Sequence, residues 1–235
     1  MINNIKLEIC CGTIDDVLVA KEFDIDRIEL NSALKLGGLT PSLATFLSAK
    51  RITNIPILCM VRPRGAGFNY SHSQFEIMLE DAEILLKNGA DGIVFGFLND
   101  DNTINIEWTK KMTDLIKKYS KEAVFHKAFD LTPDLFKACE TLIDCKVDRI
   151  LTSGGNFESL NEGLDNLNKL VNNYSDNIEI LVCGGIRGHN VVNVINSTEC
   201  TQVHAAAKIE LNDNGNYFAV SKKNIESIIK ALNTL

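Results

Sequence analysis

The sequence lacks any long apolar run. None of its 235 residues lies in an uninterrupted apolar segment approaching the ~20 residues that a membrane-spanning helix needs. The chain begins Met-Ile-Asn-Asn-Ile-Lys, with no basic segment leading into an apolar stretch, so no signal peptide is predicted. We therefore expect a cytoplasmic protein that does not bind membranes.

An excess of positive charge is also missing. The chain has 24 Lys and Arg against 31 Asp and Glu, which gives a formal net charge of −7. Affinity for phosphate backbones needs a clustered positive surface, and the pairs Lys117-Lys118 and Lys222-Lys223 are too sparse to supply one. This balance argues against a nucleic-acid-binding protein.

The seven cysteines form no paired Cys-x-x-Cys pattern, which argues against a structural zinc site. An odd number of cysteines in a cytoplasmic chain indicates reduced thiols rather than a disulfide framework. Five of them are expected to act as small hydrophobic core residues. These are Cys59, Cys139, Cys145, Cys183 and Cys200.

Short runs rich in Ile, Val and Leu alternate regularly with longer segments of helical spacing. The expected strands are Lys6–Cys11, Arg27–Asn31, Ile57–Arg62, Gly92–Phe97, Ala123–His126, Arg149–Thr152, Ile178–Cys183 and Gln202–Ala205. The expected helices are Thr13–Lys21, Ser42–Lys50, Ser73–Asn88, Glu107–Tyr119, Pro133–Cys145, Phe157–Tyr174, His189–Ser197 and Ser221–Leu235. This alternation is typical of an α/β fold with a parallel sheet.

An Asp stands just before three of the expected strands, at Asp26, Asp91 and Asp148, as expected when one βα unit is used repeatedly. No Pro-, Gly- or Ser-rich linker divides the chain. An open doubly wound sheet is the runner-up, but its Gly-x-Gly-x-x-Gly turn is absent after the first strand. The pattern therefore favours a single-domain (β/α)₈ TIM barrel over residues 1–235.

Polar residues occupy the alternate positions of the first two strands whose side chains are expected to face the barrel interior. Side chains alternate between the two faces of a strand, so Glu8 shares a face with Cys10, and Glu29 with Asn31. Because neighbouring strands lie about 4.8 Å apart, Glu8 and Glu29 are expected to be near neighbours. Two such carboxylates must share a proton or be neutralised by cations.

Other ionisable residues follow the strands expected to end at the same mouth of the barrel. We predict that Glu8, Glu29, Arg62, His126 and His204 converge in one pocket, where an acid/base role suits Glu8 or Glu29. Such groups are costly to bury unpaired, so a structural layer of salt bridges that plugs the barrel is the alternative. The full set of candidate catalytic residues is Glu8, Glu29, Arg62, His126, Asp130 and His204.

Glycines follow the sixth and seventh strands. In TIM barrels these loops often bind phosphate through backbone N–H groups, and glycine lets the backbone approach the anion closely. The expected anion-binding residues are Ser153, Gly154, Gly155, Gly184 and Gly185. Tight strand-to-helix turns are the other interpretation of these loops.

Several segments, in order along almost the whole chain, resemble the CutC family. They are Leu7-Glu8-Ile9-Cys10-Cys11, Arg27-Ile28-Glu29-Leu30, Gly37-Gly38-Leu39-Thr40-Pro41-Ser42, Arg62-Pro63-Arg64-Gly65, Tyr70-Ser71, His126-Lys127-Ala128-Phe129-Asp130, Leu151-Thr152-Ser153-Gly154 and Val203-His204. The resemblance implies a TIM barrel, a cytoplasmic location, a role in copper homeostasis and a homo-oligomer. It also implies Cu(I) binding through cysteines at the ends of the first two strands, of which Cys10 and Cys11 on the first strand remain in this sequence.

The sequence departs from the family pattern at two positions. Asn31 stands where the family usually has a cysteine, and Lys127 stands where it has an arginine. Soft thiolates are the ligands that Cu(I) prefers, so the loss of one thiol predicts weaker copper binding than in a relative that keeps both.

Three hypotheses follow from these residues. The first is a copper-handling protein that uses Cys10 and Cys11. The second is an enzyme acting on a small anionic or phosphorylated compound, and the third is a non-catalytic binding scaffold whose polar mouth is structural. The fold alone does not choose among them, because this barrel hosts many chemistries.

Overall fold

The alternating apolar and helical segments build a closed ring of eight parallel strands in the computed structural model, which describes residues 1–155 and 160–235. The strands are β1 (Lys6–Cys11), β2 (Arg27–Leu30), β3 (Ile57–Met60), β4 (Gly92–Phe95), β5 (Glu122–Phe125), β6 (Arg149–Thr152), β7 (Glu179–Val182) and β8 (Gln202–Ala205). Each strand pairs with the next along the chain, and β8 closes the ring on β1, with Leu7 opposite Val203. The expected TIM barrel is confirmed.

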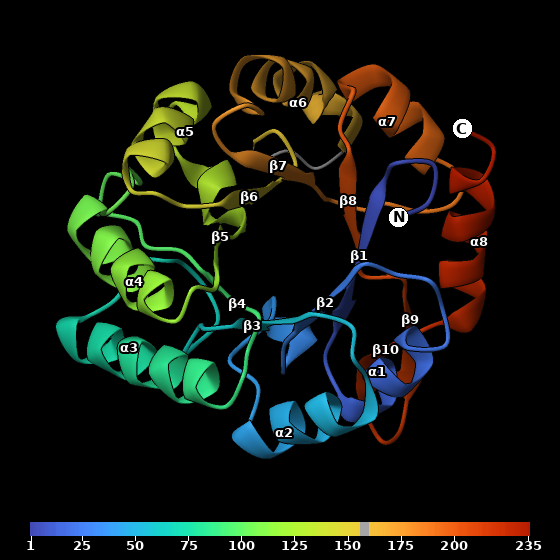
Figure 1. Cartoon of the computed structure of the whole chain (residues 1–235), viewed down its shortest axis with the longest axis horizontal. Helices are drawn as coiled ribbons and strands as arrows, with labels where there is room; N and C mark the ends of the chain where they lie inside the picture. The colour runs from blue at the N-terminus through green and yellow to red at the C-terminus, as the bar shows by residue number, and fades with distance from the viewer. Residues whose placement is uncertain (156–159) are drawn as a thin grey trace.

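Eight α-helices among the described residues surround the barrel (Figure 1). They are α1 (Ile14–Ala20), α2 (Leu43–Ile52), α3 (His72–Lys87), α4 (Ile106–Lys118), α5 (Leu135–Asp144), α6 (Leu160–Tyr174), α7 (Val191–Thr198) and α8 (Lys222–Leu232). Thr13 and Ser42, which were expected to be helical, are N-caps whose hydroxyls accept hydrogen bonds from helix N–H groups. The expected start of the sixth helix at Phe157 lies outside the described residues.

The three Asp residues that precede strands share one structural role. A carboxylate oxygen of Asp26 accepts a hydrogen bond from the N–H of Leu7 at 2.8 Å, and Asp91 accepts one from Ile57 at 2.9 Å. Asp148 accepts one from Ala123 at 2.7 Å. Each Asp thus ties the strand that it precedes to the start of the previous strand, which explains why the junction recurs.

The core has two parts because strand side chains alternate. The outward set of β1, Leu7, Ile9 and Cys11, packs in the large apolar layer shared with the helices. Inside the barrel the apolar residues form two small clusters. These are Leu58, Met60, Val94 and Val124, and Leu151, Leu181 and Cys183.

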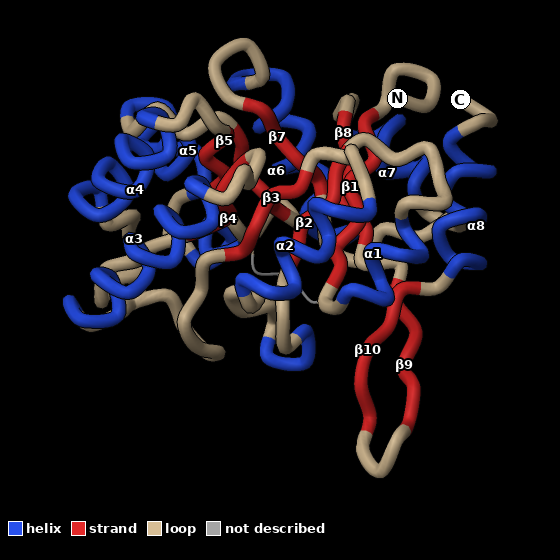
Figure 2. The backbone as a smooth tube through the Cα atoms, turned by 60° about the horizontal axis from the view of Figure 1, so that its bottom comes forward, coloured by secondary structure: helices blue, strands red, loops and turns tan. Residues whose placement is uncertain are grey.

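A β-hairpin follows β8 that the sequence analysis did not predict. Strands β9 (Lys208–Asn212) and β10 (Asn216–Val220) pair antiparallel and project away from the barrel (Figure 2). The overlooked signal is Asn214-Gly215, which supplies the positive φ angles of a hairpin turn, 50° and 159°. Apolar residues alternate with polar ones in β9, at Ile209 and Leu211, and run without interruption over residues 217–220 in β10.

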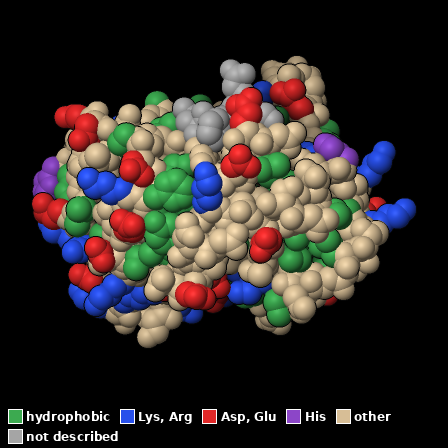
Figure 3. All heavy atoms as spheres, turned by 90° about the horizontal axis from the view of Figure 1, so that it is seen from above, with side chains coloured by type: hydrophobic (Ala, Val, Ile, Leu, Met, Phe, Trp, Pro, Cys, Tyr) green, Lys and Arg blue, Asp and Glu red, His purple; other side chains and the backbone are tan. Residues whose placement is uncertain are grey.

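Acidic and basic side chains are interspersed around apolar patches on the face drawn in Figure 3. Within the part of the chain that the structure describes, no helix has the length and apolarity required to cross a bilayer.

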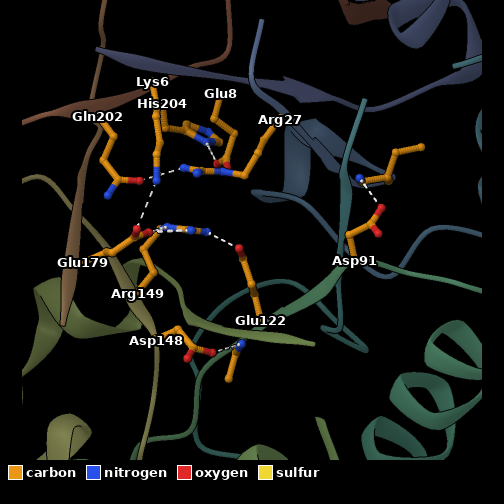
Figure 4. Close-up of polar contacts among 12 residues, drawn as sticks. Lys6, Glu8, Arg27, Asp91, Glu122, Asp148, Arg149, Glu179, Gln202 and His204 are labelled. Carbon is orange, nitrogen blue, oxygen red and sulfur yellow. Dashed lines mark hydrogen bonds and ion pairs between the residues drawn. The ribbon is translucent and has the colours of Figure 1, made fainter. Parts of the chain in front are cut away.

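Paired charged side chains lie inside the amino end of the barrel (Figure 4). The fully buried Arg149 guanidinium lies between Glu122 at 2.9 Å and Glu179 at 2.6 Å. Arg27 donates to Glu8 at 2.9 Å and to the side-chain oxygen of Gln202 at 2.7 Å. The salt-bridge layer that was considered as an alternative to a working site therefore exists, below the mouth.

This layer predicts that acid destabilises the fold. Burial alone would raise the pKa of Glu179, but Arg149 and Lys6 lower it from 4.5 to about 2. A carboxyl whose pKa is lowered by folding stabilises the native state above its unfolded pKa, and this contribution is lost as pH falls from about 4.5 to about 2. Urea unfolding measures the free energy of unfolding across this pH range. For Glu179→Gln this free energy should fall less steeply with decreasing pH than it does for the natural protein. Parallel curves would contradict this role of Glu179.

Candidate functional site

A cavity of about 150 Å³ lies at the carboxyl end of the strands. Its polar lining comes from seven residues, Cys10, Glu29, Asn31, Arg62, His126, Lys127 and His204. Four of the six candidate catalytic residues are therefore together. Glu8 lies directly behind His204, and Asp130 faces a neighbouring loop.

The barrel register sets the order of the acidic residues. On the β1–β2 pair Cys10 lies opposite Glu29, and Glu8 lies opposite Arg27. Glu8 and Glu29 therefore lie on adjacent strands but two register positions apart, because neighbouring strands of the barrel are staggered. An imidazole, that of His204, stands between the two carboxylates instead.

His204, on β8, joins the two carboxylates. Its Nδ1 lies 2.7 Å from Glu8 Oε1, and its Nε2 lies 4.0 Å from Glu29 Oε2. Burial lowers the pKa of His204, but Glu29 and Glu8 together raise it above its usual value. Because Glu8 is ionised, Nδ1 donates to it, and Nε2 faces Glu29.

The two carboxyls differ in charge state. Burial raises the pKa of Glu8, but His204 and Arg27 outweigh burial and lower it to about 2, so Glu8 is a permanent anion. Burial, together with the nearby Glu8, raises the pKa of Glu29 despite His204. Of the two proposed acid/base residues, only Glu29 is suited to exchange a proton.

Cys10, Glu29 and His204 form a potential metal site. Their ligand atoms all lie within 4.8 Å of one another. Burial and the adjacent Glu29 raise the pKa of the Cys10 thiol well above its ordinary value, so a metal must displace its proton. The Asn31 amide donates to Glu29 Oε2 at 2.8 Å and to Cys10 Sγ at 3.4 Å.

Cys11, the other cysteine expected to bind metal, is not part of this group. It is fully buried in the apolar layer between strands and helices, together with Leu7 and Ile9. The alternation of side chains along β1 points Cys10 into the barrel and Cys11 out of it, so the two thiols do not meet at one ion.

His126 enters the cavity beside a glycine. A Cβ on Gly96 would lie 2.4 Å from the imidazole carbon Cε1, so only glycine leaves room for this ring. Its Nδ1 accepts the N–H of Ala128 at 3.2 Å, and the ring packs 4.7 Å from Phe68. Burial and the nearby Arg62 lower the pKa of His126 to about 3, so the ring is neutral. Its buried Nε2 has no hydrogen-bond partner among the described residues.

Arg62 holds the loops around the cavity. Its guanidinium donates to the carbonyl oxygens of Leu36 at 3.0 Å, Gly38 at 3.1 Å and Ala66 at 2.6 Å. Nε of Arg62 is buried without a partner in the described part of the chain. Three of its five N–H donors therefore stabilise the rim, and Nε is among those that remain for a ligand.

Asp130 occupies half of the expected anion site. Its carboxylate accepts the N–H of Ser153 at 3.0 Å and of Gly155 at 3.1 Å, and it also accepts the Ser153 hydroxyl at 2.7 Å. The N–H of Gly154 is bound by the Thr152 hydroxyl at 2.9 Å. The loop after β6 therefore already holds an anion of the protein itself, and its amides are not available to an external one.

The loop after β7 borders a second cavity, of about 330 Å³, next to the first. It is lined by Gly184 and Gly185 and by three basic residues, Lys127, Arg187 and Lys208. The glycines could be found from the sequence, whereas the role of these cations could not, because they come from the separate segments that follow β5, β7 and β8 and meet only through barrel closure. His204 and Lys127 line both cavities.

Comparison with known proteins gives consistent matches. The CutC family model matches residues 5–209. A CutC family protein of Treponema denticola is 46% identical over 87% of this chain and 82% of its own length. The human copper homeostasis protein cutC homolog is 34% identical over 88% of this chain and 74% of its own length. The crystal structure of CutC from Streptococcus agalactiae superimposes with a TM-score of 0.81 at 30% identity, covering 86% of this chain and 98% of that one.

Proposed function

The chain belongs to the CutC family, and from this membership we propose that it acts in copper homeostasis by binding Cu(I) at the barrel mouth. The observation that carries the proposal is the convergence of Cys10, Glu29 and His204 within 4.8 Å. Relatives named for copper homeostasis, including the human and Drosophila melanogaster proteins, support the identity of the metal.

The donor set fits a monovalent copper ion in part. The Cys10 thiolate is the soft ligand that Cu(I) prefers, and the imidazole of His204 is a suitable second ligand. The Glu29 carboxylate is harder and better suited to divalent ions, so it contributes mainly charge. We therefore assign Cys10 and His204 as the ligands and expect moderate affinity.

Glu8 orients the histidine ligand. Its contact of 2.7 Å with Nδ1 fixes the tautomer and leaves Nε2 free to bind a metal beside Cys10. A carboxylate behind a metal-binding histidine is a recurrent arrangement that raises ligand basicity. Arg27 holds Glu8 in turn, so the charged layer below supports the site.

A competition titration against a Cu(I) chelator under reducing conditions tests the proposal. We expect one Cu(I) per chain, and Cys10→Ser should weaken binding by at least about tenfold because it removes the thiolate from the group of Cys10, Glu29 and His204. Cys183→Ser is the matched control, because Cys183 is also a buried thiol inside the barrel but lies outside the ligand group. Equal affinity of both variants, or tighter binding of Zn²⁺ than of Cu(I), would contradict the assignment.

A second candidate, an enzyme for a small polar compound, is favoured by unsatisfied buried atoms. Glu29 Oε1, Asn31 Oδ1, Arg62 Nε and His126 Nε2 are buried without a partner among the described residues, and all four side chains line the same cavity. Buried polar groups are normally hydrogen-bonded, so such a cluster suggests a ligand that satisfies them. In this candidate Glu29 is the acid/base.

Thermal-shift screening of small hydroxy acids and phosphate esters tests this candidate, with Glu29→Gln as the comparison. A compound that stabilises the natural protein but not the variant supports it. Uniform lack of stabilisation across the screen counts against it.

A further inference from the structure

The second cavity at the mouth has the composition of an anion site. Lys127, Arg187 and Lys208 line it, together with Gly184 and Gly185. Three cationic side chains around one cavity repel one another, and an anion between them removes that repulsion. The charge of this cavity therefore suits an anionic ligand.

The three cations have little compensation within the protein. Lys127 Nζ lies 3.8 Å from Asp130 Oδ2, but that carboxylate is already shared among Ser153 and Gly155 donors. Among the described residues, Arg187 and Lys208 form no ion pair. Arg187 donates to the carbonyl of Ile186 at 2.7 Å, and Lys208 Nζ lies 3.6 Å from the centre of the Phe218 ring.

The glycines provide backbone donors at the same place. Gly184 and Gly185 both have left-handed φ angles, 98° and 96°, and both are exposed. No described residue accepts a hydrogen bond from either N–H group. A Cβ on Gly185 would meet no atom within 4 Å, so open space adjoins this backbone. In contrast to the loop after β6, this loop is free to bind an external anion.

We propose that this cavity binds the phosphate group of a small molecule, with Arg187, Lys208, Lys127 and the amides of Gly184 and Gly185 as donors. An arginine offers the paired donors that phosphate oxygens accept, and two lysines add point charges. The cavity adjoins the Cys10 cavity through Lys127 and His204, so the rest of the molecule lies over the proposed metal site. The inference goes beyond copper binding and does not depend on it.

Titration of the natural protein with inorganic phosphate, followed by amide NMR and calorimetry at constant ionic strength, tests the proposal. We expect saturable binding that shifts the Gly184 and Gly185 amides, with those of Gly154 and Gly155 unmoved. The double variant Arg187→Gln/Lys208→Gln should weaken binding at least tenfold. Absence of saturation, or a double variant that binds like the natural protein, would overturn the proposal.

A charge-matched control excludes a general effect of net charge. Lys118→Gln/Lys230→Gln removes the same charge from the last turns of α4 and α8, away from the mouth, and should keep the phosphate affinity. Loss of affinity in this control equal to that in the site variant would overturn the proposal. Glycerol phosphate is titrated in parallel. Tighter binding of glycerol phosphate than of inorganic phosphate would identify an organic phosphate as the ligand, whereas equal binding of the two would identify free phosphate.

The copper-binding proposal and the phosphate-binding proposal can be contradicted independently of each other. Cys10→Ser should leave phosphate binding unchanged, and Arg187→Gln/Lys208→Gln should leave Cu(I) affinity unchanged. Lost phosphate binding with intact Cu(I) binding in the double variant supports the anion site irrespective of how the copper titration ends.

Discussion

Replacing Arg27 by Met is expected to lower the free energy of unfolding by about 3–5 kcal/mol, because it leaves a buried carboxylate without its main cation. Arg27 and Glu8 are 6% and 3% exposed at their side chains, and 2.9 Å separates the Arg27 Nε from Glu8 Oε2. The folded pKa of Glu8 lies near 2, so this carboxyl stays charged at neutral pH. Denaturant unfolding at pH 7 measures the loss.

A partly exposed ion pair supplies the matched control. Lys117 and Asp148 also pair, but their side chains are 37% and 36% exposed, so Lys117→Met should cost no more than about 1 kcal/mol. Adding Glu8→Gln to Arg27→Met should recover part of the lost stability, because it removes the orphaned charge. If Arg27→Met costs no more than Lys117→Met, the buried pair does not stabilise the barrel as argued.

Replacing Asn31 by Cys is expected to tighten Cu(I) binding by on the order of 100-fold, equivalent to about 2.7 kcal/mol, because it adds a second thiolate. The Asn31 amide nitrogen lies 3.4 Å from Cys10 Sγ, so a thiol at position 31 would lie next to that of Cys10. The same chelator competition used for Cys10→Ser measures the change.

Asn31→Ser distinguishes the effect of the added thiol on Cu(I) affinity from the effect of losing the amide. It removes the hydrogen bonds to Glu29 and Cys10 but offers no soft donor, so it should not reproduce the gain. A rise in affinity shared by both variants would show that the Asn31 amide obstructs the site, and that softness of the ligand is not the cause.

Strand parity allowed part of the site to be predicted. Because side chains alternate with period two, residue spacing alone predicted that Cys10 and Glu29 lie on the inward faces of their strands. The positions of Arg62, His126 and His204 at the carboxyl ends of expected strands likewise placed them at one mouth, because all eight strands of a (β/α)₈ barrel point the same way. These inferences need only local geometry and the fold class.

Pairings across strands could not be predicted. Parity does not give the stagger between β1 and β2, which places Cys10, not Glu8, opposite Glu29. Nor does it show that Asp130 fills the loop after β6, since that contact joins residues 22 to 25 positions apart through the packing of η2 (Lys127–Leu131) against β6. The charge states of the site residues depend on these contacts, so they could not be predicted from the sequence either.

The sequence by itself determined the alternation of strands and helices, the inward parity of the polar residues and the resemblance to the CutC family, because each depends on residue types at short spacings. Tertiary structure alone decided which of these groups meet. Ring closure brings His204 of β8 between Glu8 and Glu29, and it assembles Lys127, Arg187 and Lys208 around the Gly184-Gly185 loop. The physical reason is that shear, register and loop packing are properties of the closed barrel as a whole, and no single segment encodes them.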